Sequence, residues 1–349
     1  MKAEKKTSPA RGLQNKMKNI TDTNLLLLIT IVVFFLMYIG AIVFQGKGFL
    51  KPQTFLNILN TNAALLITSC GMSLVMITGG IDISVGGVVA LVSMSCAVYL
   101  DYKGGSIFGA ILLALGIGLA FGLVQGFLVA YLDIQPFIVT LAGMFFARGM
   151  TTIVHTNPFN VENAAFVALK DTRIVVPFLG SVNKRGVYVD AYVEIGVIVA
   201  LLVVATMFCV LRWTKLGRWF YAVGGNKQSA LMLGINVKRT KFLSHLICGT
   251  LAGVAGFVYF MHVGSGSASH ASGMEMNAIA SSIIGGTMLT GGVGNIIGTL
   301  FGVLSLSTIQ NIVSSAGLDQ AWWTGITIAA MLCLFLVIQS VVMARKKRS

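Results

Sequence analysis

Apolar residues along the chain fall into ten segments separated by polar stretches. A helix needs about 20 apolar residues to cross the roughly 30 Å hydrocarbon core of a bilayer, and all but two segments reach that length. The segments at 85–100 and 277–290 are too short, so we expect broken or partial helices there. The ten segments span residues 24–44, 55–78, 85–100, 107–131, 136–155, 191–211, 242–264, 277–290, 295–315 and 322–343.

Glycines cluster beside both short segments, at 79–87 and 285–294. Clustered glycines permit an interrupted helix, and in membranes such breaks are buried in protein or line a cavity. The pattern predicts an all-α fold: a polytopic membrane helix bundle of about ten transmembrane spans, with broken helices near 79–86 and 285–294. Aligning 79–80 with 285–286 also matches Ser84 to Thr290, which hints at two related halves.

Other glycines recur four residues apart, which places them on one face of a helix. Missing side chains on such a face let two helices approach closely. The spacing is typical of ordinary packing within a bundle, and less often of a helix-dimer motif. The glycines in question are Gly118, Gly122 and Gly126, then Gly249 and Gly253, then Gly294, Gly298 and Gly302.

Composition and charge restrict the class of protein. Only 10% of the 349 residues are charged, against about 25% in soluble domains, which excludes a water-soluble globule. The net charge is +14, but most Lys and Arg residues fall in the two tails and in the loop 212–241, so the charge indicates topology and no nucleic-acid partner. We predict basic cytoplasmic tails at 1–23 and 344–349, one transmembrane domain at 24–343, a cytoplasmic loop at 212–241 and an external loop at 156–190.

Motifs for covalent chemistry or metal binding are missing from the sequence. There is no GxxxxGK[ST] phosphate loop, no HExxH zinc motif and no GxSxG nucleophile elbow. The four His are scattered and the five Cys lie singly, which is typical of buried residues and not of a metal site or disulfide framework. We therefore expect no enzyme activity, no catalytic residue, no metal and no cofactor held by this chain.

A few ionisable and polar residues interrupt the apolar segments. An intramembrane carboxylate is costly and usually faces protein or a water-filled cavity. Asp82 either borders a translocation path together with Ser84 or caps the helix that follows. Glu275 and Asn277 are either contacts at the outer mouth of a path or a solvated helix cap. Arg148, near the outer end of its span, either pairs with an acidic residue or extends to the membrane interface.

The loop 212–241 contains a short helix of its own. Asn226 can cap a helix over 227–233, which Gly234 would end. Apolar residues of this helix would be exposed to the cytosol, as on a docking surface. Alternatively, the helix lies back on the bundle or in the lipid interface, anchored by aromatic residues. The apolar residues are Ala230, Leu231 and Leu233, and the aromatic residues are Trp219 and Tyr221.

Four segments taken together resemble one protein family. They are GGIDISVG at 79–86, QPFIVTLAGM at 135–144, AVGGNKQSA at 222–230 with Gly234, and AIASSIIGG at 278–286 with GGVG at 291–294. As an ordered set they are specific, and the likeness runs from the first apolar segment to the last. The chain resembles the permease subunits of bacterial ABC importers for monosaccharides, in the branch for ribose, xylose and galactose. In the stretches 142–149 and 322–324 it is most similar to permeases of galactofuranose importers.

The resemblance implies a permease that forms half of a two-permease core, with an identical or a related second chain. A cytoplasmic ABC ATPase would bind and hydrolyse ATP, and an external sugar-binding protein would deliver the sugar. The location implied is a bacterial cytoplasmic membrane, in contact with lipid and with both termini cytoplasmic. The substrate path would run near Asp82, Ser84 and the turn that contains Thr290. The residue match assigns ATPase coupling to Gly224, Gly225, Asn226, Ser229, Ala230, Leu233 and Gly234.

Two functions stay open at this point. The first is ATP-driven import of a neutral monosaccharide, galactofuranose or a related sugar, with energy supplied by the partner ATPase. The alternative is an ion-coupled secondary transporter or a channel for a small polar solute, which needs ionisable groups near the membrane midplane. Asp82 is the one clear group of that kind in the sequence. Dependence of uptake on a co-expressed ATPase separates the two functions.

Overall fold

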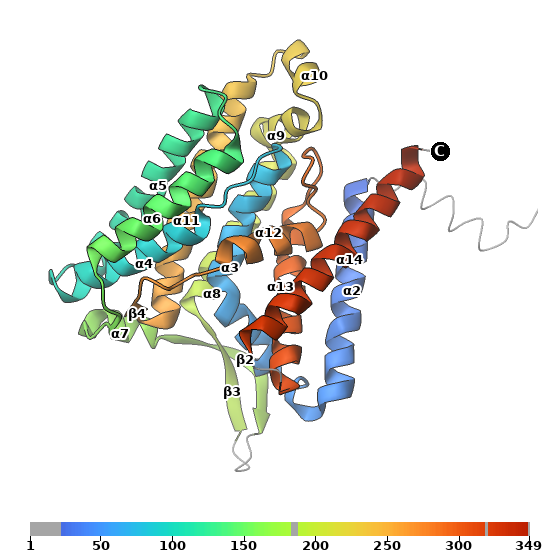
Figure 1. Cartoon of the computed structure of the whole chain (residues 1–349). Coiled ribbons are helices and arrows are strands. Elements are labelled where there is room, and N and C mark those ends of the chain that lie inside the picture. The colour runs from blue at the N-terminus through green and yellow to red at the C-terminus, as the bar shows by residue number, and fades with distance from the viewer. Residues whose placement is uncertain (1–21, 183–187, 318–319, 348–349) are drawn as a thin grey trace, which may run out of the picture.

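The computed structural model describes residues 22–182, 188–317 and 320–347, and Figure 1 shows them as a bundle of helices. Helices dominate because in lipid a helix satisfies every backbone hydrogen bond internally. The helices are α2 (Asp22–Gln45), the 3-10 helix η1 (Gly46–Gly48), α3 (Pro52–Ile77), α4 (Val85–Asp101), α5 (Ile107–Ala130), α6 (Pro136–Val154), α7 (Ala164–Lys170), α8 (Ile195–Trp213), α9 (Lys215–Gly225), α10 (Lys227–Met232), α11 (Val237–Val263), α12 (Met274–Ile284), α13 (Ile296–Ser315) and α14 (Ala321–Lys347). The strands are β1 (Phe159–Asn160), β2 (Arg173–Val182), β3 (Tyr188–Glu194) and β4 (Ser265–Gly266).

Every predicted span corresponds to a helix, and the fold is an all-α membrane bundle as expected. Within the described residues, eight helices are long and apolar enough to cross a membrane. The other two are α4, with 17 residues, and α12, with 11 residues, which match the two segments that are too short. Four predicted boundaries are wrong by four residues or more. The span predicted from residue 242 begins at Val237, because the basic residues after Asn236 are already helical, and the last span continues past residue 343 to Lys347. The span predicted from residue 191 begins at Ile195 because β3 holds the preceding residues, and the span predicted at 277–290 ends at Ile284, before two glycines.

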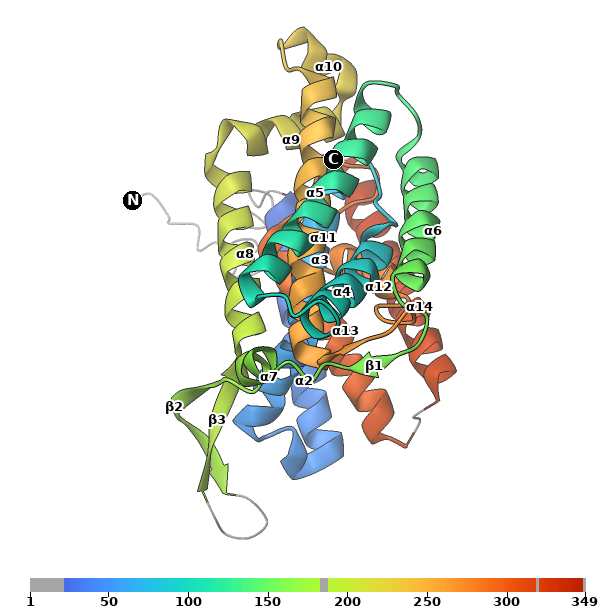
Figure 2. The ribbon, with the colours of Figure 1, turned by 90° about the vertical axis from the view of Figure 1, so that its left-hand side faces the viewer.

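The segment 156–190, predicted as a polar loop, contains secondary structure of its own. β2 and β3 pair as an antiparallel hairpin that projects from one end of the bundle, with α7 beside it (Figure 2). At the same end β1 pairs with β4, so that Phe159 lies opposite Gly266. We call this end the hairpin end. The opposite end, where α10 lies (Figure 1), is the α10 end.

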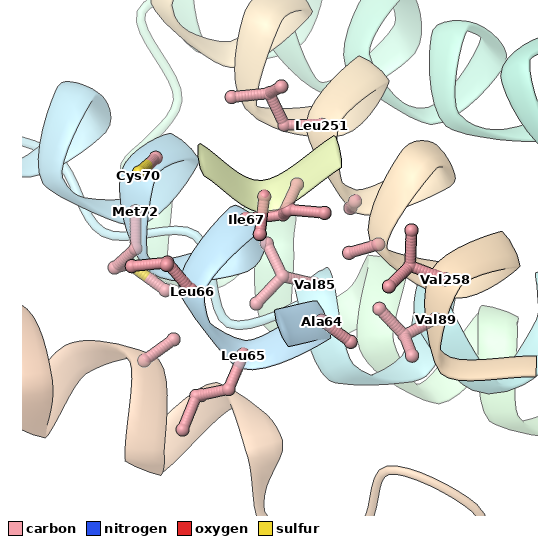
Figure 3. Close-up of a cluster of buried hydrophobic side chains, with 14 of the residues drawn as sticks. Ala64, Leu65, Leu66, Ile67, Cys70, Met72, Val85, Val89, Leu251 and Val258 are labelled. Carbon is pink, nitrogen blue, oxygen red and sulfur yellow. The ribbon is translucent and has the colours of Figure 1, made fainter. Parts of the chain in front are cut away.

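Helices α3 and α11 run through the middle of the bundle and supply much of its core. α3 is apolar on nearly all sides, as expected of a helix surrounded by protein, and its residues from Ala63 to Ile77 are buried. Figure 3 shows α3 side chains meeting those of α4 and α11. The residues of this contact include Leu66, Ile67, Val85, Val89, Leu251 and Val258.

The glycines spaced four apart bring helices into backbone contact. A Cβ added at Gly118 of α5 would lie 2.8 Å from the Cα of Gly253 in α11, closer than a real Cβ approaches. A Cβ added at Gly249 would lie 2.6 Å from the Cα of Gly122. The partners of these glycines belong to the same chain, so packing within the bundle is the correct interpretation of the α5 and α11 glycines.

Both predicted helix breaks are present, and they are built alike. α3 and α12 each end in a Schellman turn, where Gly79 (φ 83°) and Gly286 (φ 86°) take the left-handed conformation. In each turn the residue after the glycine donates a backbone hydrogen bond to the carbonyl five residues back, over 3.0 Å and 2.9 Å. The turns align Gly79 with Gly286, one residue away from the alignment predicted from the sequence. The predicted match of Ser84 to Thr290 is therefore wrong.

The described ends of the chain both lie toward the α10 end. Figure 1 shows α2 starting and α14 finishing on that side, which agrees with an even number of crossings. The predicted basic tail at 1–23 lies outside the described residues except for its last two positions. The predicted tail at 344–349 is helical through Lys347, because α14 continues, and residues 348–349 lie outside the described part of the chain.

Candidate functional site: the glycine junction and the α10 tip

Side-chain caps start each of the three helices α9, α10 and α11. At each start a Thr or Asn side-chain oxygen accepts a hydrogen bond from the backbone N–H three residues on, over 2.9 to 3.1 Å. Such a cap stabilises a helix by about 1 kcal/mol. The predicted short helix is present as α10, with Asn226 as its cap and Gly234 beyond its end at φ 75°. The other two capping residues are Thr214 and Asn236.

Helix α10 has a buried side and an exposed apolar tip. Ala230 is 1% exposed and packs with Val223 of α9 and Val237 of α11. The prediction that Ala230 belongs to the exposed surface is wrong, because its small side chain closes the gap between those helices. Ala230 is thus the one buried residue of α10, and α10 contacts the rest of the bundle through it. The exposed α10 tip consists of Leu231, Met232 and Leu233, which are 48%, 80% and 77% exposed.

The other residues assigned to coupling divide between surface and interior. Gly224 is packed into the bundle: a Cβ there would collide with the carbonyl oxygen of Ile77 and lie 2.7 Å from the nitrogen of Gly292. A Cβ added at Gly225 would meet nothing within 4 Å. Only Gly224 therefore needs to be glycine for close packing. The residues exposed beside the tip are Gly225, Asn226, Ser229 and Gly234.

Three stretches of backbone meet at Gly224: the ends of α9 and α3 and the turn 285–295. The N–H of Gly292 donates a hydrogen bond to the carbonyl oxygen of Ile77 (2.9 Å). A Cβ added at Gly291 would lie 2.9 Å from the carbonyl oxygen of Gly224 and 3.0 Å from the Cα of Gly79. We call this meeting point the glycine junction; it consists of Ile77, Gly79, Gly224, Gly291 and Gly292. Through it, α9 touches both helix breaks directly.

Tyr221 of α9 holds the same turn from the side. Its hydroxyl donates a hydrogen bond to the carbonyl oxygen of Gly294 (2.9 Å). Burial raises the pKa of Tyr221 to about 12, although the positive charge of Arg212 acts in the opposite direction. The hydroxyl therefore stays protonated and able to donate at neutral pH. Tyr221 is not a lipid-interface anchor, because its polar end is bonded inside the protein.

Asp82 is buried (1% exposed) where α4 begins. Its Oδ1 accepts hydrogen bonds from the N–H (3.0 Å) and the hydroxyl (2.6 Å) of Ser84. The same hydroxyl lies 3.1 Å from the side-chain oxygen of Gln125 in α5. Asp82 thus holds Ser84, the residue directly before α4; the N-cap of α4 is Ser84 itself, which makes no side-chain cap bond, so a capping role for Asp82 stays a prediction. Its part in a translocation path stays a prediction.

Three residues around Asp82 were not expected from the sequence. Gln125 comes from α5, and His245 and Cys248 of α11 lie beside the carboxylate. Among the described residues, Nε2 of Gln125 and Nε2 of His245 have no hydrogen-bond partner. The one sequence signal is that Gln125 falls among the glycines of α5 that face α11. These two buried nitrogens are therefore available to bond to a further polar group, in surroundings that are otherwise apolar.

Glu275 lies inside the bundle and not at a solvated outer mouth or cap, so that prediction is wrong. It is 9% exposed, its carboxylate packs against Gly86 of α4, and its Oε2 has no hydrogen-bond partner among the described residues. Among the described residues Arg148 pairs with no acidic side chain, and its guanidinium turns into the bundle and not toward the interface. Its guanidinium donates to the carbonyl oxygens of His270 (2.6 Å) and Ala271 (2.9 Å).

The other two residues predicted to lie near the substrate path, Asn277 and Thr290, are far from each other in the structure. Asn277 is partly exposed on the first turn of α12, beyond Glu275. Thr290 is exposed. It lies near the glycine junction, since a Cβ added at Gly79 would be 4.0 Å from the carbonyl oxygen of Thr290. The structure thus brings Asp82 together with Ser84 and sets Glu275 beside the same helix start, but it leaves Thr290 at the α10 end. Within the described part of the chain, no group of three or more His, Cys, Asp or Glu side chains is placed to hold a metal ion.

Comparison with known proteins identifies the family. The family model described as "Branched-chain amino acid transport system / permease component" matches residues 54–336. The chain belongs to this permease family. The match covers the glycine junction, the α10 tip and the cluster around Asp82.

Relatives of this permease are found along nearly its whole length. The inner membrane ABC transporter permease protein YjfF of Escherichia coli is 37% identical over 316 residues, which cover 90% of this chain and 92% of that protein. The fructose import permease protein FruG of Bifidobacterium longum is 34% identical, with 98% and 97% covered. The ribose import permease protein RbsC of Escherichia coli is 34% identical, with 79% and 82% covered. No solved structure matches the chain.

The permease is therefore a multi-pass membrane protein of the sugar ABC importer permease family. The family model is described by amino-acid transport, whereas two of the three relatives above are named for sugars. The family is one of transport permeases, and its ABC members imply ATPase and binding-protein partners.

Proposed function

We propose that the chain is the membrane permease subunit of an ABC importer that takes up a monosaccharide, galactofuranose or a related sugar. The sugar class rests on relatives named for fructose and ribose import and covering most of the chain. The choice of galactofuranose rests on the resemblance in the stretches 142–149 and 322–324. ATP is bound and hydrolysed by a partner ATPase, and this chain holds no cofactor.

One observation carries the proposal: the α9–α10 segment joins an exposed apolar tip to both helix breaks. Exposed apolar side chains such as Met232 (80% exposed) are typical of a surface that a partner covers. Behind the tip, Gly224 packs on the end of α3 and on the turn after α12. Movement of a partner bound at the tip therefore reaches the parts of the bundle where the helices are interrupted.

The α10 end is the cytoplasmic end in this proposal. Six basic residues of the segment 212–241 are exposed there, and basic loops are retained in the cytoplasm. Both termini then lie in the cytoplasm and the β2–β3 hairpin faces the outside, where an external binding protein delivers the sugar. The basic residues are Arg212, Lys215, Arg218, Lys227, Lys238 and Arg239. A reporter fused after residue 227 should give the cytoplasmic signal and one at residue 170 the external signal.

The test is uptake of a radiolabelled sugar by cells that express the permease with or without its ATPase. We expect uptake only with an active ATPase, and competition by unlabelled galactofuranose or a related sugar identifies the substrate. The tagged permease, solubilised gently, should retain the ATPase and a second permease that mass spectrometry can identify. Uptake that persists without any ATPase would overturn the proposal in favour of an ion-coupled transporter.

A further inference from the structure

An open cleft lies at the hairpin end, between the end of α4 and the stretch that leads from α6 to α7. Figure 2 shows β1 and α7 of this stretch at that end of the bundle. The volume of the cleft is about 680 Å³, within the range of roughly 300 to 1,000 Å³ that is typical of small-molecule sites. Aromatic and polar side chains both line it, among them Asp101, Tyr102, Phe159, Asn160, Glu162 and Asn163.

One part of the lining is a cluster of three aromatic rings. The ring of Tyr102 stacks on that of His155, with centroids 5.2 Å apart and planes 23° apart. Phe159 of β1 meets both rings edge-on, with its centroid 5.0 Å from that of Tyr102 and 4.9 Å from that of His155. Such edge-to-face pairs are favourable. The three rings therefore hold one another in place, and Tyr102, although 61% exposed, presents a fixed apolar surface.

Hydrogen bonds fix the polar part of the lining. The carboxylate of Asp101, the last residue of α4, accepts hydrogen bonds from the backbone N–H groups of Glu162 (3.0 and 3.1 Å) and Asn163 (2.9 Å). The side-chain amide of Asn163 donates to the carbonyl oxygen of Leu100 (3.3 Å). These bonds tie the stretch after β1 to the end of α4, so the cleft is formed before any ligand enters.

Two polar side chains of the lining stay free to bond to a ligand. Asn160 and Glu162 are both exposed, and within the part of the chain that the structure describes their side chains make no hydrogen bond or ion pair. An amide both donates and accepts, whereas a carboxylate only accepts. The cleft thus offers a fixed aromatic surface together with one donor–acceptor group and one strong acceptor.

We propose that this cleft binds a monosaccharide, with a C–H face of the sugar on Tyr102 and sugar hydroxyls bonded to Asn160 and Glu162. A sugar ring has apolar C–H faces and a rim of hydroxyl groups that each donate and accept, so it matches both parts of the lining. The cleft lies outside both helix breaks and the α10 tip. That it opens to the cell exterior rests on the proposed function, whereas the class of ligand rests on the chemistry of the lining.

Exposed aromatic residues at the end of a membrane span often serve as anchors in the lipid interface. Such an anchor turns its ring toward lipid. Tyr102 instead lines a cleft that it shares with the carboxylate-bearing Asp101 and Glu162, and its ring is stacked on another ring of the same chain. This setting favours a polar ligand over a lipid chain.

Sugar binding by the purified permease pair in lipid nanodiscs, without ATPase or binding protein, tests the cleft. Ribose, fructose and galactose are each titrated and followed by saturation-transfer NMR. Tyr102→Ala should weaken binding of the bound sugar about 10-fold, because the aromatic surface is lost, and Tyr102→Phe should keep most of it. Glu162→Ala should weaken binding about fivefold through one lost hydrogen bond. Tyr188→Ala, at a tyrosine 55% exposed on β3, is the matched control and should bind as the wild type does.

Two results would overturn the proposal. In the first, none of the three sugars binds to the wild type. In the second, Tyr102→Ala binds sugar as the wild type does but loses thermal stability in the nanodisc, which would make the aromatic cluster an interface anchor.

Uptake measurements separate the cleft from the proposed function. ATPase-dependent uptake together with unchanged sugar binding by Tyr102→Ala would refute the cleft alone. Sugar binding that depends on Tyr102, together with uptake that needs no ATPase, would refute the proposed function and leave the cleft as a sugar site.

Discussion

The backbone N–H of Gly292 donates a hydrogen bond to the carbonyl oxygen of Ile77, although 215 residues separate them in the chain (2.9 Å). This bond joins the end of α3 to the turn after α12, and Gly224 of α9 packs against both partners. The two interrupted helices are thus connected at one point, and α9 is part of that point. A permease that opens alternately to either side needs such a connection between its partner-binding surface and its helix breaks.

The two adjacent glycines of α9 should respond differently to a methyl group. Gly224→Ala places a Cβ against the carbonyl oxygen of Ile77, and overpacking of this kind costs about 1–3 kcal/mol. We expect a lower melting temperature in detergent and loss of most uptake. Gly225→Ala is the matched control, since its Cβ meets nothing within 4 Å. Equal melting temperatures and equal uptake for the two variants would contradict the close packing at the glycine junction.

The α10 tip should bind the ATPase through apolar contact. Met232→Asp places a charge in that contact, so we expect at least a 10-fold loss of co-purified ATPase, with thermal stability unchanged because the side chain is 80% exposed. Ser229→Arg should act in the same direction. Phe178→Asp, at a position 97% exposed on the hairpin, is the control and should keep the ATPase. Retention of the ATPase by Met232→Asp would exclude the tip as the docking surface.

Tyr221→Phe removes the hydrogen bond to Gly294 and leaves a buried carbonyl without that donor. The expected cost is about 1–3 kcal/mol of stability, measured as a lower melting temperature in detergent. Because the pKa of Tyr221 is raised from 10 to about 12, its stabilising contribution is complete below pH 10 and disappears as the pH rises through 12. The wild type should therefore lose more stability than Tyr221→Phe across that interval, and parallel pH curves would contradict the assignment.

Asp82 should stabilise the permease mainly through its two hydrogen bonds to Ser84, where α4 begins. Asp82→Ala removes the acceptor of both Ser84 bonds and should cost about 1–3 kcal/mol. Asp82→Asn keeps one oxygen for the N–H of Ser84, so we expect near-normal stability. Uptake kinetics of the stable Asp82→Asn variant then isolate the charge. Impaired transport with normal stability would indicate a role in the path, and unaltered kinetics would limit Asp82 to the helix start.

The glycines of α5 differ according to whether they face α11. Gly118→Ala places a Cβ 2.8 Å from the Cα of Gly253 and should destabilise the permease by about 1–3 kcal/mol. Gly116→Ala, two residues earlier, meets nothing within 4 Å and should be neutral or slightly stabilising, because Ala favours a helix more than Gly does. Melting temperatures of the two purified variants measure the difference. An unchanged Gly118→Ala protein would mean that α5 and α11 can separate.

Local patterns predicted the ten apolar spans, the two breaks and the Asn226 cap of α10, but not α7, α9 or the caps at Thr214 and Asn236. A membrane helix is specified by its own apolar residues, since lipid leaves the backbone no other partner. The break after α3 follows from Gly79, and the start of α10 follows from Asn226, because each acts on its immediate neighbours in the chain. The hairpin β2–β3 was not predicted, because the charged residues of the stretch 156–190 indicated a polar loop, although β2 (10 residues) is largely apolar and β3 has 7 residues.

The sequence by itself determined that this is a multi-pass helical permease with two broken helices and a capped helix at one end. Only the tertiary structure decided that Gly224 packs tightly against Ile77 while Gly225 is exposed, that Ala230 faces inward, and that Glu275 lies inside the bundle. The physical reason is how far apart in the chain the interacting residues are. A cap or an apolar span depends on residues within one or two turns, whereas burial depends on which distant segment packs against the residue, as Ile77 and the turn 285–295 pack against Gly224.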